Sequence, residues 1–400
     1  MKELEFEVSE YERRLSAIQK AMHTDRLDAI LITSEDHFRY FTGWHSPTWS
    51  NLTRPRYAVL PRVGPMVLIV PLSNTIISER TSWVTDVRTW IAPCPADDGI
   101  TLLRDAIREV PRVHGRIGAE LGAESRLTMP VGDFLRLGKE ISPIEIVDGY
   151  PILRRLLGVK SSAEIEKIYK ISQIASASYE ALPASLKTGM TIKEVCTVFK
   201  RDLLSRGAET FPYIIAVAEQ YGYPCINLEP SGKKIAHDDI LIIDTAATFE
   251  GYYCDFNREY AFGGLQDIVR KIYDIVWEAT DVGIQATEPG RTVADVWQVI
   301  ASSMEKSANK LGVPFEPVEV GRMGHGLGLR MCEPPSIAPE DKTPIEIGTV
   351  LTIEPNMVYH IEVKGQKRRY VLVHEENIAV TEQAVRLLTR RAPPAMPIIT

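Results

Sequence analysis

The sequence contains no apolar run that approaches the roughly 18–20 residues of a membrane-spanning helix. Its first residues, MKELEFEVSEYERR, are too acidic and polar for a secretory signal peptide. Its five cysteines are odd in number and include no Cys-x-x-Cys pair, a pattern that indicates reduced thiols. Together these absences predict a cytoplasmic protein that does not bind a membrane.

Basic charge is also in short supply, with 46 Lys and Arg against 53 Asp and Glu and a formal net charge of −7. A nucleic-acid-binding protein normally presents a basic face, so we expect no nucleic-acid partner. Hydrophobic residues make up 44% of the chain and charged residues 25%, as in ordinary globular proteins. A length of 400 residues exceeds one ordinary core and predicts two domains.

Helical and strand-like patterns alternate over the first 150 residues, which argues for a small α/β domain. The predicted elements are a helix over residues 9–23, strands at 27–33, 57–60 and 66–70, and helices near 101–110 and 130–139. After residue 152, longer helices are predicted: one that Pro183 ends, and others over 191–207, 265–283 and 292–310. Ser161 or Ser162 and Thr292 are expected N-caps, and the second helix is expected to start near Thr191.

The stretch LIIDTAATFEGYYCD carries two carboxylates, Asp244 and Asp255, on either side of an acidic turn at Glu250-Gly251. Its apolar start and β-prone tyrosines predict a strand, a turn and a second strand that bring both acids to one place. They are either surface acids beside a turn or a buried pair. Because buried carboxylates repel each other, a buried pair would require a cation between them.

Three downstream positions favour the buried pair. Glu354 and Glu375 each stand at the end of an apolar, strand-like run, where a bare carboxylate is unusual. His325 lies between two glycines in Gly324-His325-Gly326-Leu327-Gly328, where the backbone can approach closely. Four carboxylates and one imidazole would suit two divalent ions that share bridging oxygens.

This set, in this order, resembles the pita-bread metallohydrolase family, which includes methionine aminopeptidase, Xaa-Pro aminopeptidase, prolidase and the metal-free creatinase. The family pattern is Asp, a second Asp eleven positions on, His in an HGxG turn, Glu in a T-x-E-P strand, and Glu six positions before a threonine. These positions fall on Asp244, Asp255, His325, Glu354 and Glu375, with Thr381 as the final marker. The resemblance implies an α/β creatinase-like N-terminal domain over residues 1–152 and an α+β pita-bread catalytic domain over residues 153–400.

Carried over residue by residue, the resemblance implies that Asp244 chelates one metal, His325 and Glu354 the other, and Asp255 and Glu375 both. A bridging water would then attack a scissile carbonyl, with Glu354 shuttling the proton. The resemblance implies two divalent ions, with Mn²⁺ preferred and Zn²⁺, Co²⁺ or Fe²⁺ as alternatives. Thr352, two residues before Glu354, is expected on the same strand face and near the metals. His374 and Glu376 are interpreted as structural.

The resemblance breaks where peptidases of the family hold the peptide. Two of their substrate histidines correspond here to Asn227 and Cys332, and an arginine before the last Glu corresponds to Val373. Asn227 can form hydrogen bonds but cannot donate a proton as imidazolium does. The metal chemistry is therefore better supported than the substrate.

The segment 40–57, YFTGWHSPTWSNLTRPRY, is unusually rich in aromatic residues and arginines for a connecting loop. It is either a well-packed loop with solvated arginines or a substrate-binding loop. In creatinase-like dimers a similar loop reaches the partner's active site, and an arginine holds a substrate carboxylate there. Arg54 and Arg56 both match, and the resemblance also implies a homodimer.

The leading prediction is an Xaa-Pro aminopeptidase or prolidase, a dinuclear hydrolase that cleaves an amide bond next to proline in a small peptide. The alternative keeps the fold and the metals but acts on a small non-peptide substrate, as a creatine- or ectoine-like hydrolase or a dimethylsulfoniopropionate lyase. A third possibility is a non-catalytic binding protein with a vestigial site. Retention of all five ligand positions argues against this third possibility.

Overall fold

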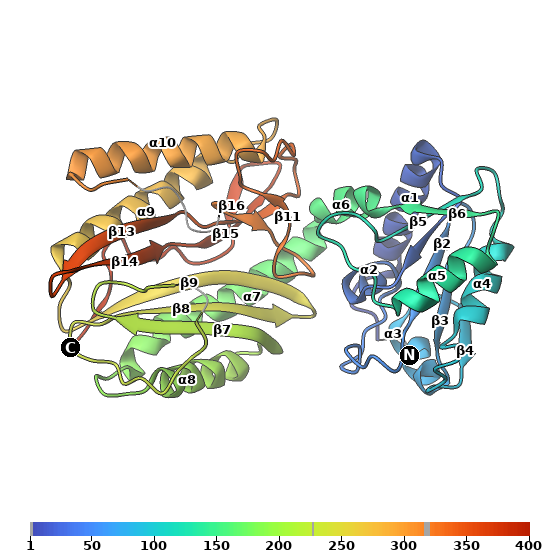
Figure 1. Cartoon of the computed structure of the whole chain (residues 1–400), viewed down its shortest axis with the longest axis horizontal. Coiled ribbons are helices and arrows are strands. Elements are labelled where there is room, and N and C mark those ends of the chain that lie inside the picture. The colour runs from blue at the N-terminus through green and yellow to red at the C-terminus, as the bar shows by residue number, and fades with distance from the viewer. Residues whose placement is uncertain (1–2, 226–227, 316–320) are drawn as a thin grey trace. The chain divides into compact units, whose positions relative to one another are not determined.

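The computed structural model describes residues 3–225, 228–315 and 321–400. It divides into two compact units, Met1–Leu157 and Gly158–Thr400 (Figure 1). The expected boundary after residue 152 falls inside helix α6, Tyr150–Gly158, and the structure places the division at the end of that helix. Within the described ranges no helix combines the length and the apolar character needed to cross a membrane. The five cysteines, all within the described ranges, form no disulfide.

The N-terminal unit has a six-stranded mixed sheet. Its strands are β1 (Ala29–Ile32), β2 (Tyr57–Pro61), β3 (Val67–Pro71), β4 (Asp86–Trp90), β5 (Arg116–Ala119) and β6 (Glu145–Asp148). Its helices are α1 (Val8–Asp25), α2 (Glu35–Thr42), α3 (Thr75–Thr81), α4 (Ile100–Glu109), α5 (Val131–Glu140) and α6, with a 3₁₀ turn at Leu72–Asn74. The strand order is β4-β3-β2-β1-β5-β6. The predicted helices and strands are confirmed, and α2, α3, β4, β5 and β6 are additional.

The unit predicted to be catalytic, Gly158–Thr400 (the catalytic unit), contains two sheets and a hairpin in its described residues. Its strands are β7 (Thr210–Glu219), β8 (Ile240–Phe249), β9 (Tyr252–Phe262), β10 (His325–Gly326), β11 (Glu333–Ser336), β12 (Val350–Ile353), β13 (Asn356–Val363), β14 (Gln366–Val373), β15 (Glu376–Val380), β16 (Val385–Leu387) and β17 (Ile398–Ile399). Its helices are α7 (Ser162–Ala181), α8 (Ile192–Ser205), α9 (Asp267–Ala286) and α10 (Val293–Leu311), with a 3₁₀ turn at Leu182–Ser185.

The two halves of this unit are each covered by a helix pair. One sheet has the order β17-β9-β8-β7, and α7 and α8 pack against it. The other has the order β11-β10-β12-β15-β16, and together with the β13–β14 hairpin it packs against α9 and α10. Figure 1 shows the helix pairs on opposite outer sides of the unit, with the strands between them.

Local sequence signals explain where the helices begin. Ser161, Thr191 and Thr292 each accept a hydrogen bond from the backbone three residues on, where an acidic side chain bonds back to the cap. These reciprocal capping boxes satisfy backbone N–H groups that the first helical turn leaves free. The predicted caps are confirmed, with Ser161 rather than Ser162 at the first.

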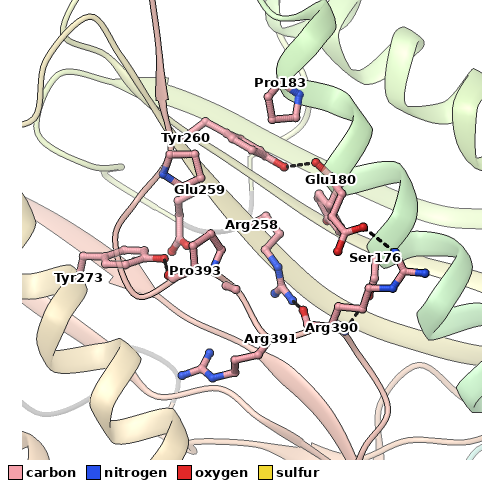
Figure 2. A pocket seen from close by; sticks show the side chains of 13 residues that line it. Ser176, Glu180, Pro183, Arg258, Glu259, Tyr260, Tyr273, Arg390, Arg391 and Pro393 are labelled. Carbon is pink, nitrogen blue, oxygen red and sulfur yellow. Dashed lines mark hydrogen bonds and ion pairs between the residues drawn. The ribbon is translucent and has the colours of Figure 1, made fainter.

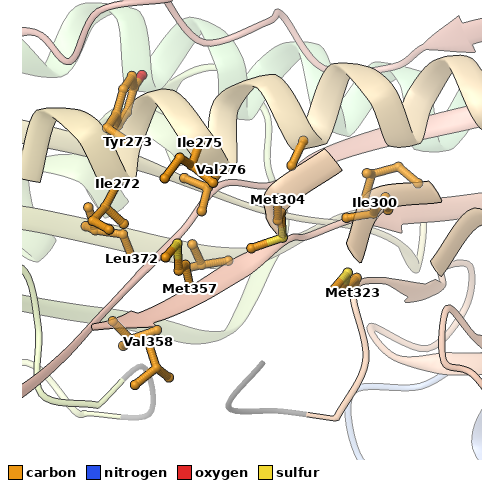
Figure 3. Close-up of a cluster of buried hydrophobic side chains, with 14 of the residues drawn as sticks. Ile272, Tyr273, Ile275, Val276, Ile300, Met304, Met323, Met357, Val358 and Leu372 are labelled. Atoms are coloured by element: carbon orange, nitrogen blue, oxygen red, sulfur yellow. The ribbon is translucent and has the colours of Figure 1, made fainter. Parts of the chain in front are cut away.

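A buried apolar cluster connects helices α9 and α10 to the segment that leads into His325. In Figure 3, Ile272 and Val276 of α9 lie near Met304 of α10 and Met357 of β13. Met323, two residues before His325, belongs to the same cluster, and its carbonyl accepts a hydrogen bond from the Glu354 backbone N–H at 3.0 Å. The core therefore fixes the backbone around two predicted metal ligands.

Candidate metal centre

The β8–β9 hairpin places two acids on one face. Asp244 pairs with Asn257 and Ala246 with Asp255, and directly opposed residues of antiparallel strands share a face. Glu250 and Gly251 at the turn have φ of 47° and 79°, as a two-residue type I′ hairpin turn requires. The predicted strand–turn–strand arrangement is confirmed.

A tyrosine from the neighbouring strand joins these acids. The hydroxyl of Tyr213 in β7 donates to Asp255 Oδ1 at 2.8 Å and lies 3.3 Å from Asp244 Oδ2. Burial, followed by the two carboxylates, raises the pKa of Tyr213 far above its usual value, so the hydroxyl keeps its proton. Sequence reasoning missed Tyr213, although it lies two residues before Ile215, which pairs with Asp244.

His325 is fixed at the start of β10 by its own backbone surroundings. Its N–H donates to Thr352 Oγ1 at 3.1 Å, and its Nδ1 lies 2.9 Å from the Gly326 carbonyl, which assigns the ring proton to Nδ1. Burial, and then the charge of Arg322, lower the pKa of His325 to about 3. The neutral ring therefore presents a free Nε2 lone pair, 3.6 Å from Asp255 Oδ2.

Gly324 allows this close approach. Its φ is +146°, and a Cβ atom there would lie 2.2 Å from the Thr352 carbonyl oxygen. Any side chain would therefore push β10 away from β12. The glycine before the histidine is a steric requirement of the site.

Two glutamates complete the cluster from the other sheet. Glu354 follows β12, and Glu375 lies between β14 and β15. Burial raises the pKa of Glu354 to about 7 and that of Asp244 to about 6. Burial, and then the neighbouring carboxylates, raise the pKa values of Asp255 and Glu375 well above their usual range. Such mutual destabilisation is what a bound cation would relieve.

The donor atoms fit a metal. Single donor atoms of Asp255, His325 and Glu375 all lie within 4.8 Å of one another. Among the described residues, one buried oxygen each of Asp244, Glu354 and Glu375 has no hydrogen-bond partner. Unpaired buried carboxylate oxygens are costly, and oxygen donors with one imidazole suit a divalent transition metal.

Asn377 ties the two sheets together at this point. Its side chain accepts a hydrogen bond from the Asp255 N–H at 3.1 Å and donates to the Asp255 carbonyl. The neighbouring Glu376 points elsewhere, into ion pairs with Arg258 and Arg391, and His374 packs against Arg391. The structural interpretation of Glu376 and His374 is therefore confirmed.

Arg322 is a cation at the edge of the cluster that sequence reasoning also missed. Its Nε lies 3.5 Å from Glu354 Oε1, and its side chain forms a hydrogen bond with the Cys332 thiol. Cys332 itself is exposed. The feature of the sequence that could have revealed Arg322 is its position three residues before His325.

The remaining predicted substrate residues are distributed differently. Asn227 lies outside the described residues. Arg56 is buried in the N-terminal unit, where it donates to Asn74 Oδ1 at 2.9 Å and lies over the rings of Trp44 and Trp49. Arg54 is half-buried, and both arginines line a cavity of about 490 Å³ in the same unit. The well-packed interpretation of the 40–57 loop thus holds for Arg56.

The structure thus combines a two-unit fold with a buried cluster of carboxylates and one imidazole. Within this cluster, Asp255, His325 and Glu375 form a possible metal site. A model of the metallopeptidase family M24 matches residues 166–382, and one of the creatinase/prolidase N-terminal domain matches residues 14–156. The chain belongs to the metallopeptidase family M24. The expected creatinase-like and pita-bread domains are confirmed.

Individual relatives are distant but span most of the chain. The Xaa-Pro dipeptidase of Pyrococcus furiosus is 26% identical over 272 residues, which cover 68% of this chain and 73% of that protein. The uncharacterized peptidase YqhT of Bacillus subtilis is 24% identical over 91% of this chain and 94% of its own length. The solved dipeptidase PepE of Mycobacterium ulcerans has a TM-score of 0.80 at 25% identity, covering 98% of this chain and 99% of its own.

Proposed function

We propose that the protein is a dinuclear metal-dependent hydrolase that cleaves the amide bond next to proline in small peptides. Asp244, Asp255, His325, Glu354 and Glu375 would hold the two ions. When bound, divalent ions supply Lewis-acid activation of water and of the scissile carbonyl. The observation that carries the proposal is the set of buried, unpartnered oxygens on Asp244, Glu354 and Glu375 beside a neutral imidazole.

Side chains of the protein would supply proton transfer and orient the ligands. A carboxylate beside the scissile bond can accept and return a proton. We assign proton transfer to Glu354 Oε1, which has no hydrogen-bond partner among the described residues. Tyr213 orients Asp255 by its 2.8 Å hydrogen bond, and Thr352 orients His325.

Mn²⁺ is the first choice of metal, since carboxylate oxygens outnumber the single nitrogen, and Zn²⁺, Co²⁺ and Fe²⁺ remain alternatives. We further propose a homodimer in which Arg54 reaches the partner's site and binds the substrate carboxylate. Arg56 is unsuited to this role because its guanidinium is already held by Asn74 and by the carbonyls of Thr48 and Trp49. Arg54 is only half-buried and borders a cavity.

A second candidate function keeps the metals but changes the substrate to a small non-peptide compound. The observation that favours it is Cys332, which occupies a position where the family's peptidases carry a histidine. Its thiol forms a hydrogen bond with Arg322, and desolvation raises its pKa. A neutral thiol cannot act as imidazolium does.

The deciding experiment is hydrolysis of Xaa-Pro dipeptides and tripeptides by Mn²⁺-loaded protein, with metal content measured in parallel. Asp244→Ala should remove at least one ion and the activity, whereas Glu362→Ala, which changes an exposed glutamate of β13, should leave both unchanged. Preference for dipeptides would indicate a prolidase, and preference for tripeptides an aminopeptidase. Two bound ions without peptide cleavage would refute the peptidase and favour the second candidate.

A further inference from the structure

A second cavity, of about 360 Å³, lies in the catalytic unit and shares no lining residue with the proposed metal site. Figure 2 shows side chains from α7, β9 and α9 around it, closed on one side by the segment Arg390–Pro393. Its volume falls in the range of about 300–1,000 Å³ found for small-molecule sites.

One carboxylate oxygen in the described part of its wall lacks a partner. Glu259 of β9 is 3% exposed, and its Oε2 has no hydrogen-bond partner among the described residues. Its other oxygen has only a long contact, 3.5 Å, with the Tyr223 hydroxyl. Burial raises the pKa of Glu259 to about 8, which reflects the cost of a charge left without a donor.

Two tyrosine hydroxyls in the wall of the cavity already donate to backbone carbonyls. The Tyr260 hydroxyl donates to the Tyr179 carbonyl at 2.9 Å, and the Tyr273 hydroxyl donates to the Pro393 carbonyl at 2.7 Å. Pro393, toward which Glu259 and Tyr273 point in Figure 2, has no backbone N–H to offer. These described groups therefore leave Glu259 Oε2 without a donor, and an occupant of the cavity would supply one.

The charged residues in the wall predict that the occupant carries a positive charge. The three arginines of the wall are each matched by a carboxylate: Arg258 by Glu376 at 2.9 Å, Arg391 by Asp281 at 2.7 Å, and Arg390 by Glu180. Within the described part of the wall, Glu259 is the carboxylate left unmatched. A cationic donor would favour the ionised form of Glu259 and satisfy its hydrogen bonding.

We propose that this cavity binds a small organic ammonium compound, which donates to Glu259 Oε2 and packs its apolar body against Tyr260, Tyr273 and Pro393. Tyrosine rings also favour a cation placed over their faces. Arg258 in its wall also donates to the backbone carbonyl of Glu375, a proposed metal ligand, at 3.1 Å. The site does not depend on the proposed peptidase activity.

The test uses calorimetry of the full-length, Mn²⁺-loaded protein with benzylammonium chloride, and benzyl alcohol as a neutral probe of similar shape. Saturable binding of the cation and at least about tenfold weaker binding of the alcohol are expected, as for loss of a charged hydrogen bond. Glu259→Gln should weaken cation binding by at least about tenfold. Glu180→Gln, in the same wall but already paired with Arg390, should change it less than about twofold.

No saturable binding, equal binding of both probes, or unchanged binding by Glu259→Gln would each overturn the proposal. The last outcome would place the cation elsewhere, for example at the metal-site carboxylates. If Glu259→Gln does not fold, a crystal of the unmodified protein soaked with benzylammonium decides. Density for the probe beside Glu259 supports the proposal, and density anywhere else refutes it.

Discussion

Removing metal from the protein at pH 8 should destabilise the catalytic unit, and lowering the pH should restore part of the loss. The reason is the cluster of four buried carboxyl groups, whose pKa values are all raised in the absence of a cation. A carboxyl group whose pKa is higher in the folded than in the unfolded protein binds its proton more tightly when folded. The free energy of unfolding therefore falls as the pH rises between the two values.

The size of the effect follows from two members of the cluster. The pKa of Asp244 rises from 3.8 to about 6, and that of Glu354 from 4.5 to about 7. At about 1.4 kcal/mol per pKa step, each rise corresponds to roughly 3 kcal/mol of lost stability in the metal-free protein. The loss should accumulate between about pH 4 and pH 7 and be complete at pH 8.

The assay is calorimetric unfolding of chelator-treated and Mn²⁺-loaded protein at pH 5, 6, 7 and 8. Calorimetry is preferred because the two units can unfold in separate transitions. The metal-free transition of the catalytic unit should move to lower temperature as the pH rises, while the loaded protein should be most stable at pH 7–8. The gap between the two should be widest at pH 8.

A pair of adjacent variants provides the control. Glu375→Gln removes one charge from the cluster and should flatten the pH dependence of the metal-free protein while reducing the stabilisation by Mn²⁺. Glu376→Gln breaks ion pairs with Arg258 and Arg391 instead, and should lower stability at every pH without flattening the curve. A metal-free protein as stable at pH 8 as at pH 5 would refute the reasoning, as would identical behaviour of the two variants.

Three further predictions concern single residues. Tyr213→Phe should weaken metal affinity by about 10–100-fold, because it removes a hydrogen bond that orients a ligand, and titration with Mn²⁺ measures this; unchanged affinity would contradict the role. Arg54→Ala should raise KM for peptides with a free carboxylate without changing metal content, whereas Arg56→Ala should lower the Tm of the N-terminal unit through its lost contacts with Asn74 and the tryptophans; the reverse pattern would exchange their roles. Gly324→Ala should cost at least about 1–3 kcal/mol in urea unfolding and reduce metal binding, because its Cβ would meet a carbonyl oxygen at 2.2 Å, and a neutral result would show that β10 can shift.

Local signals in the sequence predict much of the fold. The capping residues Ser161, Thr191 and Thr292 and the Glu250-Gly251 turn act over three or four neighbouring positions, so a single sequence contains what is needed to recognise them. The edge strand β6 is short and partly exposed, which weakens the apolar pattern that would reveal it.

Contacts between residues far apart in the sequence are harder to predict from the sequence alone. Tyr213 reaches the clustered carboxylates because β7 pairs with β8, and Arg322 reaches them because its side chain lies beside Glu354. Arg54 and Arg56 are two residues apart and chemically identical, yet packing buries Arg56 beside two tryptophans and leaves Arg54 half-buried. Glu259 follows an arginine in an apolar strand, and its lack of a partner is visible only when the whole wall of the cavity is known.

The spacing of the proposed ligands along the chain has a consequence for synthesis of the protein. His325 and Glu375 follow Asp255 by 70 and 120 positions, so the β8–β9 hairpin emerges from the ribosome long before its partners. At a translation rate of ~5–20 residues per second, the interval before Glu375 is made is roughly 6–24 s. During that time a nascent chain would carry two of the acids without the imidazole or the glutamates that complete the cage. Ion binding would therefore come late in synthesis. A tightly bound ion would indicate a chain in which the two sheets of the catalytic unit have already packed together.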